Sequence, residues 1–539
     1  MTDGFDWLEK DRKVAQRDLA RAYGFARRDA QRSTDATDTT DSTASFRSAP
    51  AASVDGAVVD VGNLIAGTSR PAADGRTISV INPATSKEIA TIPRSGTSDV
   101  AAAVAAAKTA LPAWSATPLA KRCAILTKAA DLIESRMDEF ASLESRDTGK
   151  PVKLARSLDV PRAISNLRFF AEFAVAEGRI EHPMPGHLNY TVRAPVGVVG
   201  LITPWNLPIY LLSWKAAPAL AMGNTVVAKP SELTPLSADA LGKVLLEAGL
   251  PPGVFNVVHG LGPEAGQALV EHPEVRAISF TGGTATGRRV AQSAAPHLKK
   301  VSLELGGKNP TIVFADCDMD ATVEGVVRSA FTNTGQICLC GSRILVEAKA
   351  EKEFTKRLVA RTQQMKVGDP ADPATDLGSL VSKEHRAKVE AYITIAKADG
   401  GRIPLGGSRP KLPTPFSDGA FLEPTIVTGL AQSSRCVQEE IFGPVVTIQA
   451  FADEAEAVRL ANDVRYGLAA SVWTTDAAKA KRVAEALDTG MVWVNCWLVR
   501  DLRVPFGGMK ESGVGREGGR HSLDFFSEPR NICVKGGAP

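Results

Sequence analysis

Ala277-Ile278-Ser279-Phe280-Thr281-Gly282-Gly283-Thr284-Ala285-Thr286-Gly287 is the stretch that decides the fold class. It begins with a mostly apolar run of strand length, continues into a glycine-rich turn and ends where a helix is expected to begin. The backbone N–H groups of such a turn and the positive end of the following helix can approach a pyrophosphate. A strand that leads through a tight turn into a helix is typical of sheets whose strands run parallel.

Apolar runs of similar length recur along the chain, and helical patterns separate several of them. The strand-length runs are residues 196–201, 225–228, 255–258, 301–305 and 311–314, and the helical patterns are residues 101–107, 120–145, 154–176, 237–248 and 264–270. Thr97 and Ser98 are N-cap candidates for the first helix. This alternation predicts an α/β fold with a doubly wound, Rossmann-like parallel sheet that is covered on both faces.

Length and composition limit the class of protein. The chain has 539 residues, 44% of them hydrophobic, so two or more packed units are expected. Its 63 basic and 60 acidic residues nearly balance, which gives no support for a nucleic-acid partner. No apolar run reaches the roughly 20 residues that span a bilayer. The acidic start, Met1-Thr2-Asp3-Gly4-Phe5-Asp6, resembles neither a signal peptide nor a transit peptide. We therefore expect a soluble, cytoplasmic enzyme with no membrane partner.

The first part of the chain differs in composition from the rest. Residues 5–32 are charge-dense with scattered apolar positions, a pattern that fits an amphipathic helix. Residues 33–52 are rich in Ser, Thr, Asp and Ala and have almost nothing to bury, which predicts a disordered linker. The extension either docks a partner or is a solvated tail, and its composition favours the tail.

Three segments are candidates for ligand contact at the ends of expected strands. Two are glycine-rich turns, residues 281–287 and 260–266, and neither has the usual spacing of the dinucleotide fingerprint. The third is Lys229-Pro230-Ser231-Glu232, where a Lys can meet a phosphate or ribose and a Glu can accept from a ribose hydroxyl. The alternatives are turns without a ligand and a loop with ordinary surface charges.

A cysteine in Phe331-Thr332-Asn333-Thr334-Gly335-Gln336-Ile337-Cys338-Leu339-Cys340 is a candidate nucleophile. Seven cysteines in so long a chain do not indicate a disulfide framework and leave room for a reactive thiol. A lone Cys is usually a small buried hydrophobe, but the Gly and polar residues before Cys338 predict a turn. The Cys-x-Cys pair lacks the further cysteines or His that a metal site needs, so no metal is expected.

Seven short motifs, in this order and spacing, resemble the aldehyde dehydrogenase superfamily. They are Pro204-Trp205-Asn206, Lys229-Pro230-Ser231-Glu232, Phe280-Thr281-Gly282, Leu303-Glu304-Leu305-Gly306-Gly307-Lys308, residues 333–338, Glu440-Ile441-Phe442-Gly443-Pro444 and Pro505-Phe506-Gly507-Gly508. The resemblance extends over residues 61–535. Any one motif is weak evidence, but seven in series leave little room for coincidence.

The resemblance implies a division of the chain into domains. It implies an N-terminal extension at residues 1–56, an NAD-binding domain at 57–177 and 195–306, a catalytic α/β domain at 307–519 and a β arm at 178–194 and 520–539. Strand-like alternation at Tyr190, Val192, Ile532 and Val534 is consistent with the arm. Members of the superfamily form dimers and tetramers, so a homo-oligomer paired through this arm is expected, with homotetramer and dimer both open.

The resemblance also implies roles for individual residues. Cys338 resembles the nucleophile, Glu304 resembles the general base, and Asn206 resembles the residue whose amide joins the Cys338 backbone N–H in binding the oxyanion. The residues expected at NAD are Trp205, Lys229, Ser231, Glu232, Gly262, Thr281, Gly282, Gly283, Gly287, Leu305, Glu440 and Phe442. In this set Lys229, Glu232 and Glu440 would hold the two riboses, and Phe442 would lie near the nicotinamide. The usual pattern has Ser at the position of Gly283, so one side-chain contact is expected to be missing.

These residue types suit aldehyde oxidation. A thiolate attacks the aldehyde carbon, preorganised N–H donors stabilise the oxyanion, and loss of hydride to nicotinamide leaves a thioester. A carboxylate can then activate water to release the acid, so the presence of Glu304 favours a free carboxylic acid over transfer to coenzyme A. Glu232 would place negative charge where the 2′-phosphate of NADP must lie, so NAD is the expected cofactor.

Within the superfamily the chain is most similar to enzymes for 2-aminomuconic and 2-hydroxymuconic semialdehyde, from tryptophan breakdown and aromatic-ring catabolism. The supporting stretches are Cys338-Leu339-Cys340, Asp159-Val160-Pro161-Arg162, Asn166-Leu167-Arg168-Phe169-Phe170 and Asn495-Cys496-Trp497-Leu498-Val499-Arg500. In that branch Arg162 and Arg500 would grip a carboxylate of the substrate, and the alternative is that both are surface ion-pair residues. Two other functions remain: an aldehyde dehydrogenase for aliphatic or amino-aldehydes, and a non-catalytic NAD-binding protein with the same fold.

Overall fold

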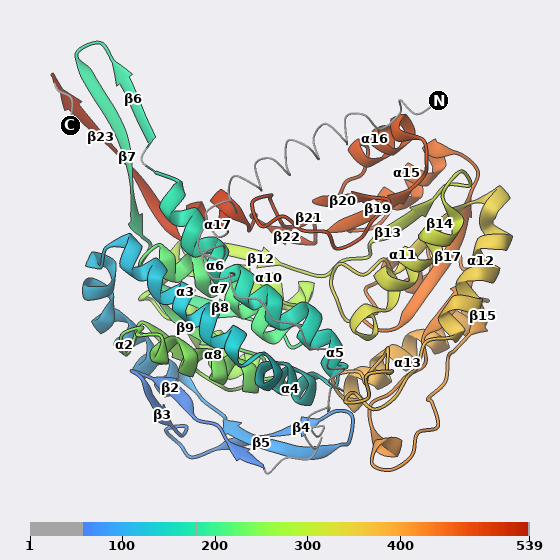
Figure 1. The fold of residues 1–539 in the computed structure, drawn as a ribbon, viewed down its shortest axis with the longest axis horizontal. Coiled ribbons are helices and arrows are strands. Elements are labelled where there is room, and N and C mark those ends of the chain that lie inside the picture. The colour runs from blue at the N-terminus through green and yellow to red at the C-terminus, as the bar shows by residue number, and fades with distance from the viewer. Residues whose placement is uncertain (1–57, 179, 537–539) are drawn as a thin grey trace, which may run out of the picture.

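The strands of the chain form two large sheets and three small ones. The computed structural model describes residues 58–178 and 180–536. The expected amphipathic helix and linker near the N-terminus lie outside the described residues. Figure 1 shows the two large sheets side by side, with a small sheet projecting from one end.

The first large sheet has eight strands. In spatial order they are β22 (Gly513–Val514), β12 (Lys300–Glu304), β11 (Val275–Thr281), β8 (Val198–Ile202), β9 (Thr225–Lys229), β10 (Phe255–Val257), β2 (Asn63–Ile65) and β3 (Thr68–Arg70). The five strands from β12 to β10 run parallel, and the outer ones are antiparallel. The chain builds the sheet outward from β8 in one direction through β9 and β10 and then in the other through β11 and β12, so a topological switch point lies between β8 and β11.

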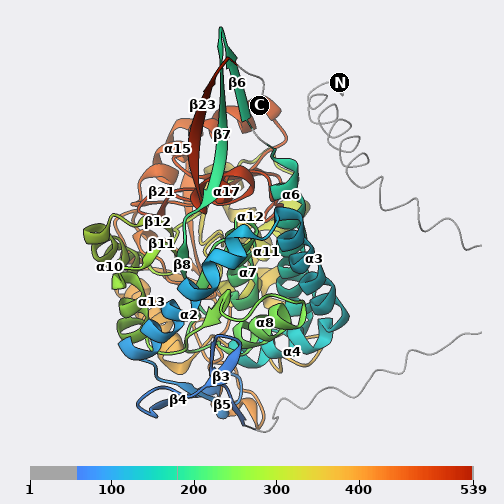
Figure 2. The same ribbon diagram turned by 90° about the vertical axis from the view of Figure 1, so that its left-hand side faces the viewer.

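Helices cover both faces of this sheet. Packed on one face are α3 (Leu119–Ser135), α6 (Val160–Ala176), α7 (Pro208–Ala221) and α8 (Leu236–Glu247). Packed on the other are α2 (Thr97–Ala116), α9 (Gln267–Glu271) and α10 (Thr284–Ala294). Figure 2 shows α2, α3 and α8 from the side opposite the second sheet. The predicted doubly wound α/β architecture is confirmed. Within residues 58–178 and 180–536, no helix is long and apolar enough to cross a membrane.

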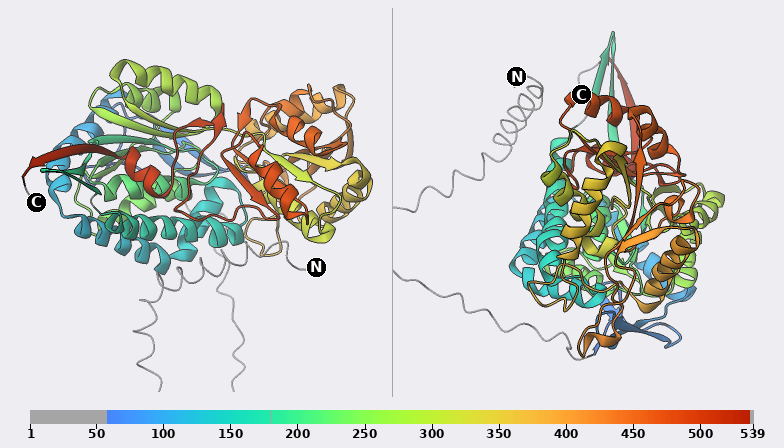
Figure 3. Two further views of the ribbon diagram at one scale, coloured as in Figure 1. Left: turned by 90° about the horizontal axis from the view of Figure 1, so that it is seen from above. Right: turned by 90° about the vertical axis from the view of Figure 1, so that its right-hand side faces the viewer.

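The second large sheet has seven strands. In spatial order they are β15 (Arg402–Leu405), β16 (Thr425–Thr428), β17 (Val445–Phe451), β14 (Arg343–Glu347), β13 (Pro310–Val313), β19 (Ala469–Trp473) and β20 (Met491–Val494). All but β15 run parallel. Its helices are α11 (Met319–Phe331), α12 (Ala348–Gln363), α13 (Lys383–Ala398), α14 (Arg435–Gln438), α15 (Glu454–Asn462) and α16 (Ala477–Glu485). The view from above in Figure 3 separates the two sheets with their helices.

The small sheets connect and extend these units. Their strands are β1 (Val59–Asp60), β5 (Lys87–Pro93) and β4 (Thr77–Asn82); β18 (Tyr466–Gly467) and β21 (Met509–Lys510); and β23 (Ser527–Lys535), β7 (His187–Pro195) and β6 (Ile180–Met184). The last three are the projecting strands of Figure 1, and α17 (Gly519–Phe525) leads into β23. The predicted domain boundaries stay a prediction, and β22 crosses them because residues 513–514 pair with β12 of the first sheet.

Some local expectations about helices were wrong. The N-cap of α2 is Gly96, one residue before Thr97 and two before Ser98, and its N–H donates to the Asp99 carboxylate at 3.0 Å. The helix expected over residues 120–145 is interrupted at Arg136 and continues as α4 (Met137–Thr148). The helix expected over residues 154–176 begins as α5 (Val152–Leu154) and passes through a π-helical turn, η1 (Ala155–Asp159), before α6. Such single π turns are common near functional sites.

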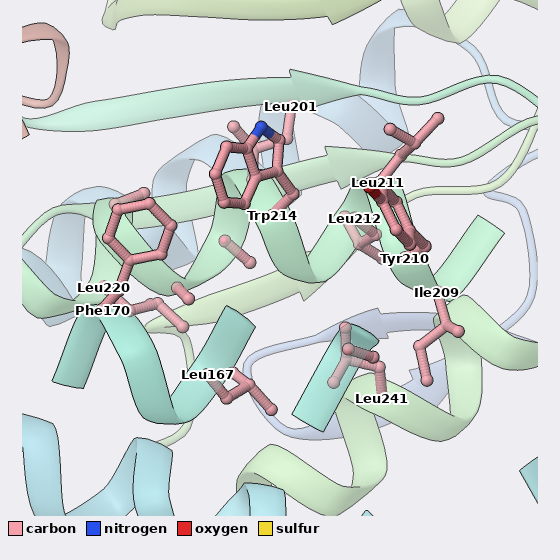
Figure 4. Packing of buried hydrophobic residues seen from close by; sticks show 14 of the residues in the cluster. Leu167, Phe170, Leu201, Ile209, Tyr210, Leu211, Leu212, Trp214, Leu220 and Leu241 are labelled. Carbon is pink, nitrogen blue, oxygen red and sulfur yellow. The ribbon is translucent and has the colours of Figure 1, made fainter. Parts of the chain in front are cut away.

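The packing of α6 against α7 fixes the positions of two helices that carry predicted site residues or their neighbours. Leu167 and Phe170 of α6 are fully buried in the same cluster as Trp214 of α7 (Figure 4), and the Phe170 and Trp214 ring centroids lie 5.2 Å apart. Leu241 of α8 belongs to the same cluster. Burial of side chains of this size contributes roughly 1.5–3 kcal/mol each, so α6, α7 and α8 form one rigid layer.

Leu167→Ala should destabilise the protein by about 2–5 kcal/mol, because it removes a fully buried side chain from a closed core. The measurement is the midpoint of thermal unfolding. Val175→Ala, on the same helix but at a side chain that is 53% exposed, is the matched control and should leave the midpoint nearly unchanged. Equal midpoints for the two variants would contradict this account of the layer.

Candidate active site

Four predicted site residues lie at the carboxyl edge of the first sheet. Glu304 ends β12, Thr281 ends β11 and Lys229 ends β9, while Asn206 follows β8 by four residues. Because these strands are parallel, their carboxyl ends meet at one edge, on either side of the switch point. The side chains of distant segments are thereby brought together without any of them being close in sequence.

A pocket with about 340 Å³ of empty space, including its opening to solvent, contains the predicted nucleophile. Its lining residues are Leu158, Leu207, Tyr210, Leu211, Ile337, Cys338, Leu339, Leu498, Arg500 and Phe506. The wall is therefore almost wholly apolar, with one thiol, one guanidinium and one phenol. A pocket of this kind orients a ligand through its few polar groups.

The segment before Cys338 is a tight turn, as its composition predicts. Asn333 and Thr334 have left-handed backbones (φ 55° and 56°), and a side chain at Gly335 would collide with the backbone of Gly443. The Asn309 amide donates to the Cys338 carbonyl oxygen at 2.7 Å. These constraints hold the cysteine backbone rigidly, and its side chain is only partly exposed.

The surroundings of the Cys338 thiol disfavour its thiolate form. Burial raises the pKa of the Cys338 thiol well above its usual range, and the charges of Glu440 and Glu304 raise it further, while Arg500 opposes them. The neighbouring Cys340 is also buried, and burial raises its pKa to about 12. Within the described residues no group of three His, Cys, Asp or Glu side chains could hold a metal ion.

Glu304 is a buried carboxyl group with unusual surroundings. Burial raises its pKa well above the usual range, the nearby Glu517 raises it further, and Lys215 acts in the opposite direction. Its Oε1 has no hydrogen-bond partner among the described residues. A Cβ on Gly507 would lie 2.8 Å from that oxygen, so the glycine leaves room for it. A carboxylate with a raised pKa is a stronger base once it is ionised.

Asn206 lies beside the nucleophile turn. Its side-chain Nδ2 donates to the Gln336 carbonyl oxygen at 2.8 Å, two residues before Cys338. Its own carbonyl oxygen accepts from Asn333 Nδ2 at 3.1 Å and from Lys150 Nζ at 3.0 Å. The loop after β8 and the turn that carries Cys338 are thus bonded to each other twice.

A buried ionic network behind Glu304 has no counterpart in the sequence predictions. Lys215 Nζ donates to Glu517 at 2.6 Å and to Ser279 Oγ at 2.9 Å, and Trp214 Nε1 donates to Glu517 at 2.7 Å. Lys215 is fully buried in the all-buried helix α7. The sequence contained a signal for this network, because Lys215 is a charged residue inside an apolar run. That run is Pro208-Ile209-Tyr210-Leu211-Leu212-Ser213-Trp214-Lys215-Ala216-Ala217.

The residues predicted at the cofactor fall into two groups along the sheet edge. In the first, Lys229 Nζ pairs with Glu232 at 2.9 Å, and Ser231 Oγ accepts from the Leu233 N–H at 3.3 Å. Lys229 is 3% exposed, so the alternative of two ordinary surface charges is wrong for it. Gly262 opens the π-helical turn Gly262–Gly266 with free space where a side chain would be.

The glycine turn after β11 belongs to the same edge. The Gly282 N–H donates to the Glu304 carbonyl oxygen at 3.0 Å, and Gly287 lies against the Leu305 side chain, where any Cβ would collide. Gly283, where the family pattern has Ser, faces open space. The Thr281 hydroxyl is buried and has no partner among the described residues. The turn therefore has open space at Gly283 and an unpartnered hydroxyl at Thr281.

The second group lies across from the first, near the thiol. Glu440 Oε1 accepts from the Gly307 N–H at 2.9 Å, and a Cβ on Gly306 would collide with the Glu440 carboxylate. Phe442 has a left-handed backbone (φ 61°), and its ring meets the Trp205 ring edge-on at 5.2 Å. The His385 ring lies 5.0 Å from Trp205, and His385 Nε2 lies 2.7 Å from the Phe442 carbonyl oxygen.

Arg162 and Arg500 both lie beside Tyr210, and Arg500 lines the pocket. Arg500 donates to the Tyr210 hydroxyl at 2.7 Å, and its guanidinium lies 4.0 Å from the Phe506 ring centroid. Arg162 lies 5.7 Å from the Tyr210 ring centroid. Burial lowers the pKa of Arg162, and the positive charge of Arg500 lowers it further. Among the described residues neither arginine pairs with a carboxylate, which argues against the surface ion-pair alternative.

Known proteins share both the sequence and the architecture. The model of the aldehyde dehydrogenase family matches residues 70–532. The chain belongs to the aldehyde dehydrogenase family. It is 52% identical over 479 residues to a 2-aminomuconic semialdehyde dehydrogenase of Danio rerio (88% of this chain, 98% of the relative). It is 49% identical over 483 residues to a 2-hydroxymuconic semialdehyde dehydrogenase of Pseudomonas sp. strain CF600 (88% and 99%).

A solved structure places this aldehyde dehydrogenase in the same fold. The betaine aldehyde dehydrogenase of Staphylococcus aureus, solved in complex with NAD⁺, superposes with a TM-score of 0.85 at 38% identity and covers 89% of this chain and 95% of its own. The predicted family resemblance and fold class are therefore confirmed. For this aldehyde dehydrogenase, sequence reasoning found the thiol, the carboxyl group and the two arginines but missed Tyr210, Lys215, Glu517 and Lys150.

Iodoacetamide should label Cys338 slowly at neutral pH in the cofactor-free enzyme, with a rate that is still rising at alkaline pH. The reason is that a raised pKa leaves less thiolate at neutral pH, and the thiolate is the reacting form. The measurement is the mass-spectrometric labelling rate of the Cys338 peptide as a function of pH. The exposed Cys533 serves as an internal reference for reagent quality. A Cys338 rate that levels off at or below neutral pH would contradict the raised pKa.

Proposed function

We propose that the enzyme oxidises an aldehyde that carries a carboxylate to the corresponding acid, through a thioester on Cys338 and with NAD as the acceptor. The observation that supports this most directly is the pocket, in which an apolar wall joins the Cys338 thiol to the guanidinium of Arg500. Arg162 lies close by, and neither arginine has an acidic partner among the described residues. Two uncompensated guanidinium groups in one pocket suit a carboxylate ligand.

The residues of the sheet edge fit NAD. Lys229 and Glu232 stand at the end of β9, where they could bind the hydroxyls of one ribose, and Glu440 lies beside the thiol for the other. The unpartnered Thr281 hydroxyl and the open space at Gly283 suit a pyrophosphate at the start of α10. The Glu232 carboxylate would repel the 2′-phosphate of NADP. The solved relative from Staphylococcus aureus contains NAD⁺.

The first half of the reaction forms the bond to sulfur. The Cys338 thiol gives its proton to solvent, and the sulfur attacks the aldehyde carbon while the carbonyl oxygen becomes an oxyanion. The second N–H of the Asn206 amide and the Cys338 backbone N–H donate to that oxygen, and each such donor contributes roughly 3–4 kcal/mol. When bound, NAD supplies the acceptor for the hydride that leaves the substrate carbon, and the carbonyl reforms as a thioester.

The second half releases the acid. Glu304 takes a proton from water, the water oxygen attacks the thioester carbon, and the carbon–sulfur bond breaks to return the Cys338 thiolate. The raised pKa of Glu304 makes it a competent base for this step. Glu304 then releases that proton to solvent, and the nearby charges of Glu517 and Lys215 act on its pKa in opposite directions.

The two arginines and the names of the relatives both support a particular substrate class. A semialdehyde with a distal carboxylate would place that group between Arg162, Arg500 and the Tyr210 hydroxyl, with its aldehyde at Cys338. Relatives with about half of their residues identical are named 2-aminomuconic and 2-hydroxymuconic semialdehyde dehydrogenases. We therefore propose an aminomuconate or hydroxymuconate semialdehyde as substrate. An aliphatic or amino-aldehyde substrate, or a non-catalytic role, would leave the arginine pair without a purpose.

We also propose that the enzyme is a homo-oligomer assembled through its projecting strands. Within the described residues, β6 and β23 each pair with β7 on one side only. Their outer edges present unpaired backbone groups, which a second copy of the chain could complete.

Cys338→Ala should abolish NADH formation, because no other described thiol faces the aldehyde in this pocket. Glu304→Gln should form about one NADH per active site rapidly and then turn over slowly, because the thioester accumulates. The measurements are stopped-flow NADH absorbance and the mass of the acylated protein. Unaltered turnover by Cys338→Ala would refute the thioester mechanism.

Arg162→Ala and Arg500→Ala should each raise the KM for a carboxylate-bearing semialdehyde by about 10- to 150-fold, which corresponds to the loss of one charge-assisted hydrogen bond of roughly 1.5–3 kcal/mol. A neutral aldehyde of similar length should be nearly unaffected. Arg168→Ala is the matched control on the same helix, because Arg168 pairs with Asp131 and Glu134 at the surface. Equal losses on both substrates would refute the carboxylate grip and leave a broader aldehyde specificity.

A further inference from the structure

Lys150 is a fully buried lysine to which the reaction just described gives no task. It follows Gly149, whose left-handed backbone (φ 74°) ends α4, and its side chain is 1% exposed. Burying an ammonium group is unfavourable unless its donors find strong partners. The identity of those partners therefore shows what the charge is for.

The ammonium of Lys150 has two hydrogen-bonded partners. It donates to Asp159 Oδ1 at 2.8 Å and to the Asn206 carbonyl oxygen at 3.0 Å. A second carboxylate, Glu144 Oε2, lies 3.7 Å away. Glu144 and Asp159 are fully buried as well, so one ammonium and two carboxyl groups share a site without solvent. An ion pair that contributed only to stability would not require the additional hydrogen bond to the Asn206 carbonyl oxygen.

The carbonyl in question belongs to the residue that supplies the oxyanion donor. Asn206 is held at both ends: its carbonyl accepts from Lys150 and Asn333, and its side-chain amide donates to the Gln336 carbonyl beside the nucleophile. A shift of the backbone at residue 206 would carry the amide with it. Since the value of an oxyanion donor depends on its placement, such a shift reduces the rate.

Asp159, whose carboxylate orients Lys150, belongs to a segment that borders the pocket. Asp159 is the last residue of the π-helical turn η1, Leu158 before it lines the pocket, and Arg162 follows in the first turn of α6. On its other side, the Gly149 carbonyl accepts from the Ser379 N–H at 3.1 Å. Lys150 thus stands where the substrate wall, the Asn206 loop and a loop before α13 meet.

We propose that Lys150, oriented by Asp159, is a positioning residue for Asn206: its ammonium fixes the residue 206 carbonyl so that the side-chain amide points at the substrate oxyanion. The inference rests on the proposed function, because it assigns Asn206 the oxyanion. Lys150 itself touches neither the substrate nor the thiol and acts through Asn206.

The test is a double-mutant cycle on the full-length enzyme. Lys150→Met keeps an unbranched side chain as long as the lysine stem and removes the ammonium, and it should lower kcat by about 10- to 100-fold with little change in the KM for the aldehyde or in NAD binding. In an Asn206→Ala background the same change should lower kcat by no more than about 2-fold, because the group it positions is gone. A loss of the same size in both backgrounds, or no loss in the unaltered background, would overturn the proposal.

A second variant keeps the test valid if Lys150→Met does not fold. Asp159→Asn preserves size and one acceptor oxygen while weakening the hold on the ammonium, so it should show a smaller loss that also vanishes in the Asn206→Ala background. The matched control is Asp147→Asn, a buried carboxyl of α4 that accepts from the Leu236 N–H at 2.7 Å and does not contact Asn206. It should lower the unfolding midpoint and leave kcat unchanged.

The outcome separates this inference from the proposed function. Cys338→Ala, run in parallel, tests the thioester chemistry without reference to Lys150. If that variant is inactive while the Lys150→Met loss persists without Asn206, only the positioning role fails. If Cys338→Ala retains full turnover, the reaction scheme itself fails and the Lys150 proposal fails with it.

Discussion

The parallel pairing of β8 with both β9 and β11 is the constraint on which the rest of the structure depends. It makes β8 the strand from which the sheet grows in both directions, so the loop after β8 sits at the switch point. Ligands of open α/β sheets bind in the crevice at such a point. Asn206 lies in that loop, and the neighbouring strands end at Lys229, Thr281 and Glu304. The geometry of the site is thus a consequence of strand order.

The second sheet contributes the turn with Cys338 and the loop with Glu440 to the crevice. Its first strand, β13, follows β12 by a short connection, and the turn with Cys338 and the loop with Glu440 approach the edge from this side. Asn309, in the connection itself, donates to the Cys338 carbonyl and accepts from the Ala469 N–H. The turn that carries Cys338 is therefore hydrogen-bonded to the connection between the two sheets. Preorganisation of this kind is what catalysis by positioning and electrostatics requires.

Burial gives the site its electrostatic character. The Cys338 thiol and Glu304 are both held toward their neutral forms, because desolvation and neighbouring carboxylates disfavour negative charge. Two buried ammonium groups, Lys150 and Lys215, stand behind Asn206 and Glu304. Each is matched by carboxylates, so the charge is compensated and its direction is fixed.

The sequence by itself determined the class of fold and the family, and it predicted the reacting groups. Strand-length apolar runs before glycine turns, and seven motifs in series, were sufficient, because periodicity and local residue types are properties of short segments. The same evidence located Cys338, Glu304, Asn206, Arg162 and Arg500. It failed for the N-cap at Gly96 and for the interruption at Arg136, because the ends of helices depend on local backbone angles that propensity does not specify.

Only the tertiary structure decided that Arg162 and Arg500 both lie beside Tyr210, and that Lys215, Glu517 and Lys150 are members of buried ion pairs rather than surface charges. These contacts join residues that are far apart in the chain, as Lys215 and Glu517 are, and no pattern within a short window can encode such a pair. A buried charge is tolerated only where folding brings its partner to it. Whether a buried charge has its partner therefore depends on the tertiary structure.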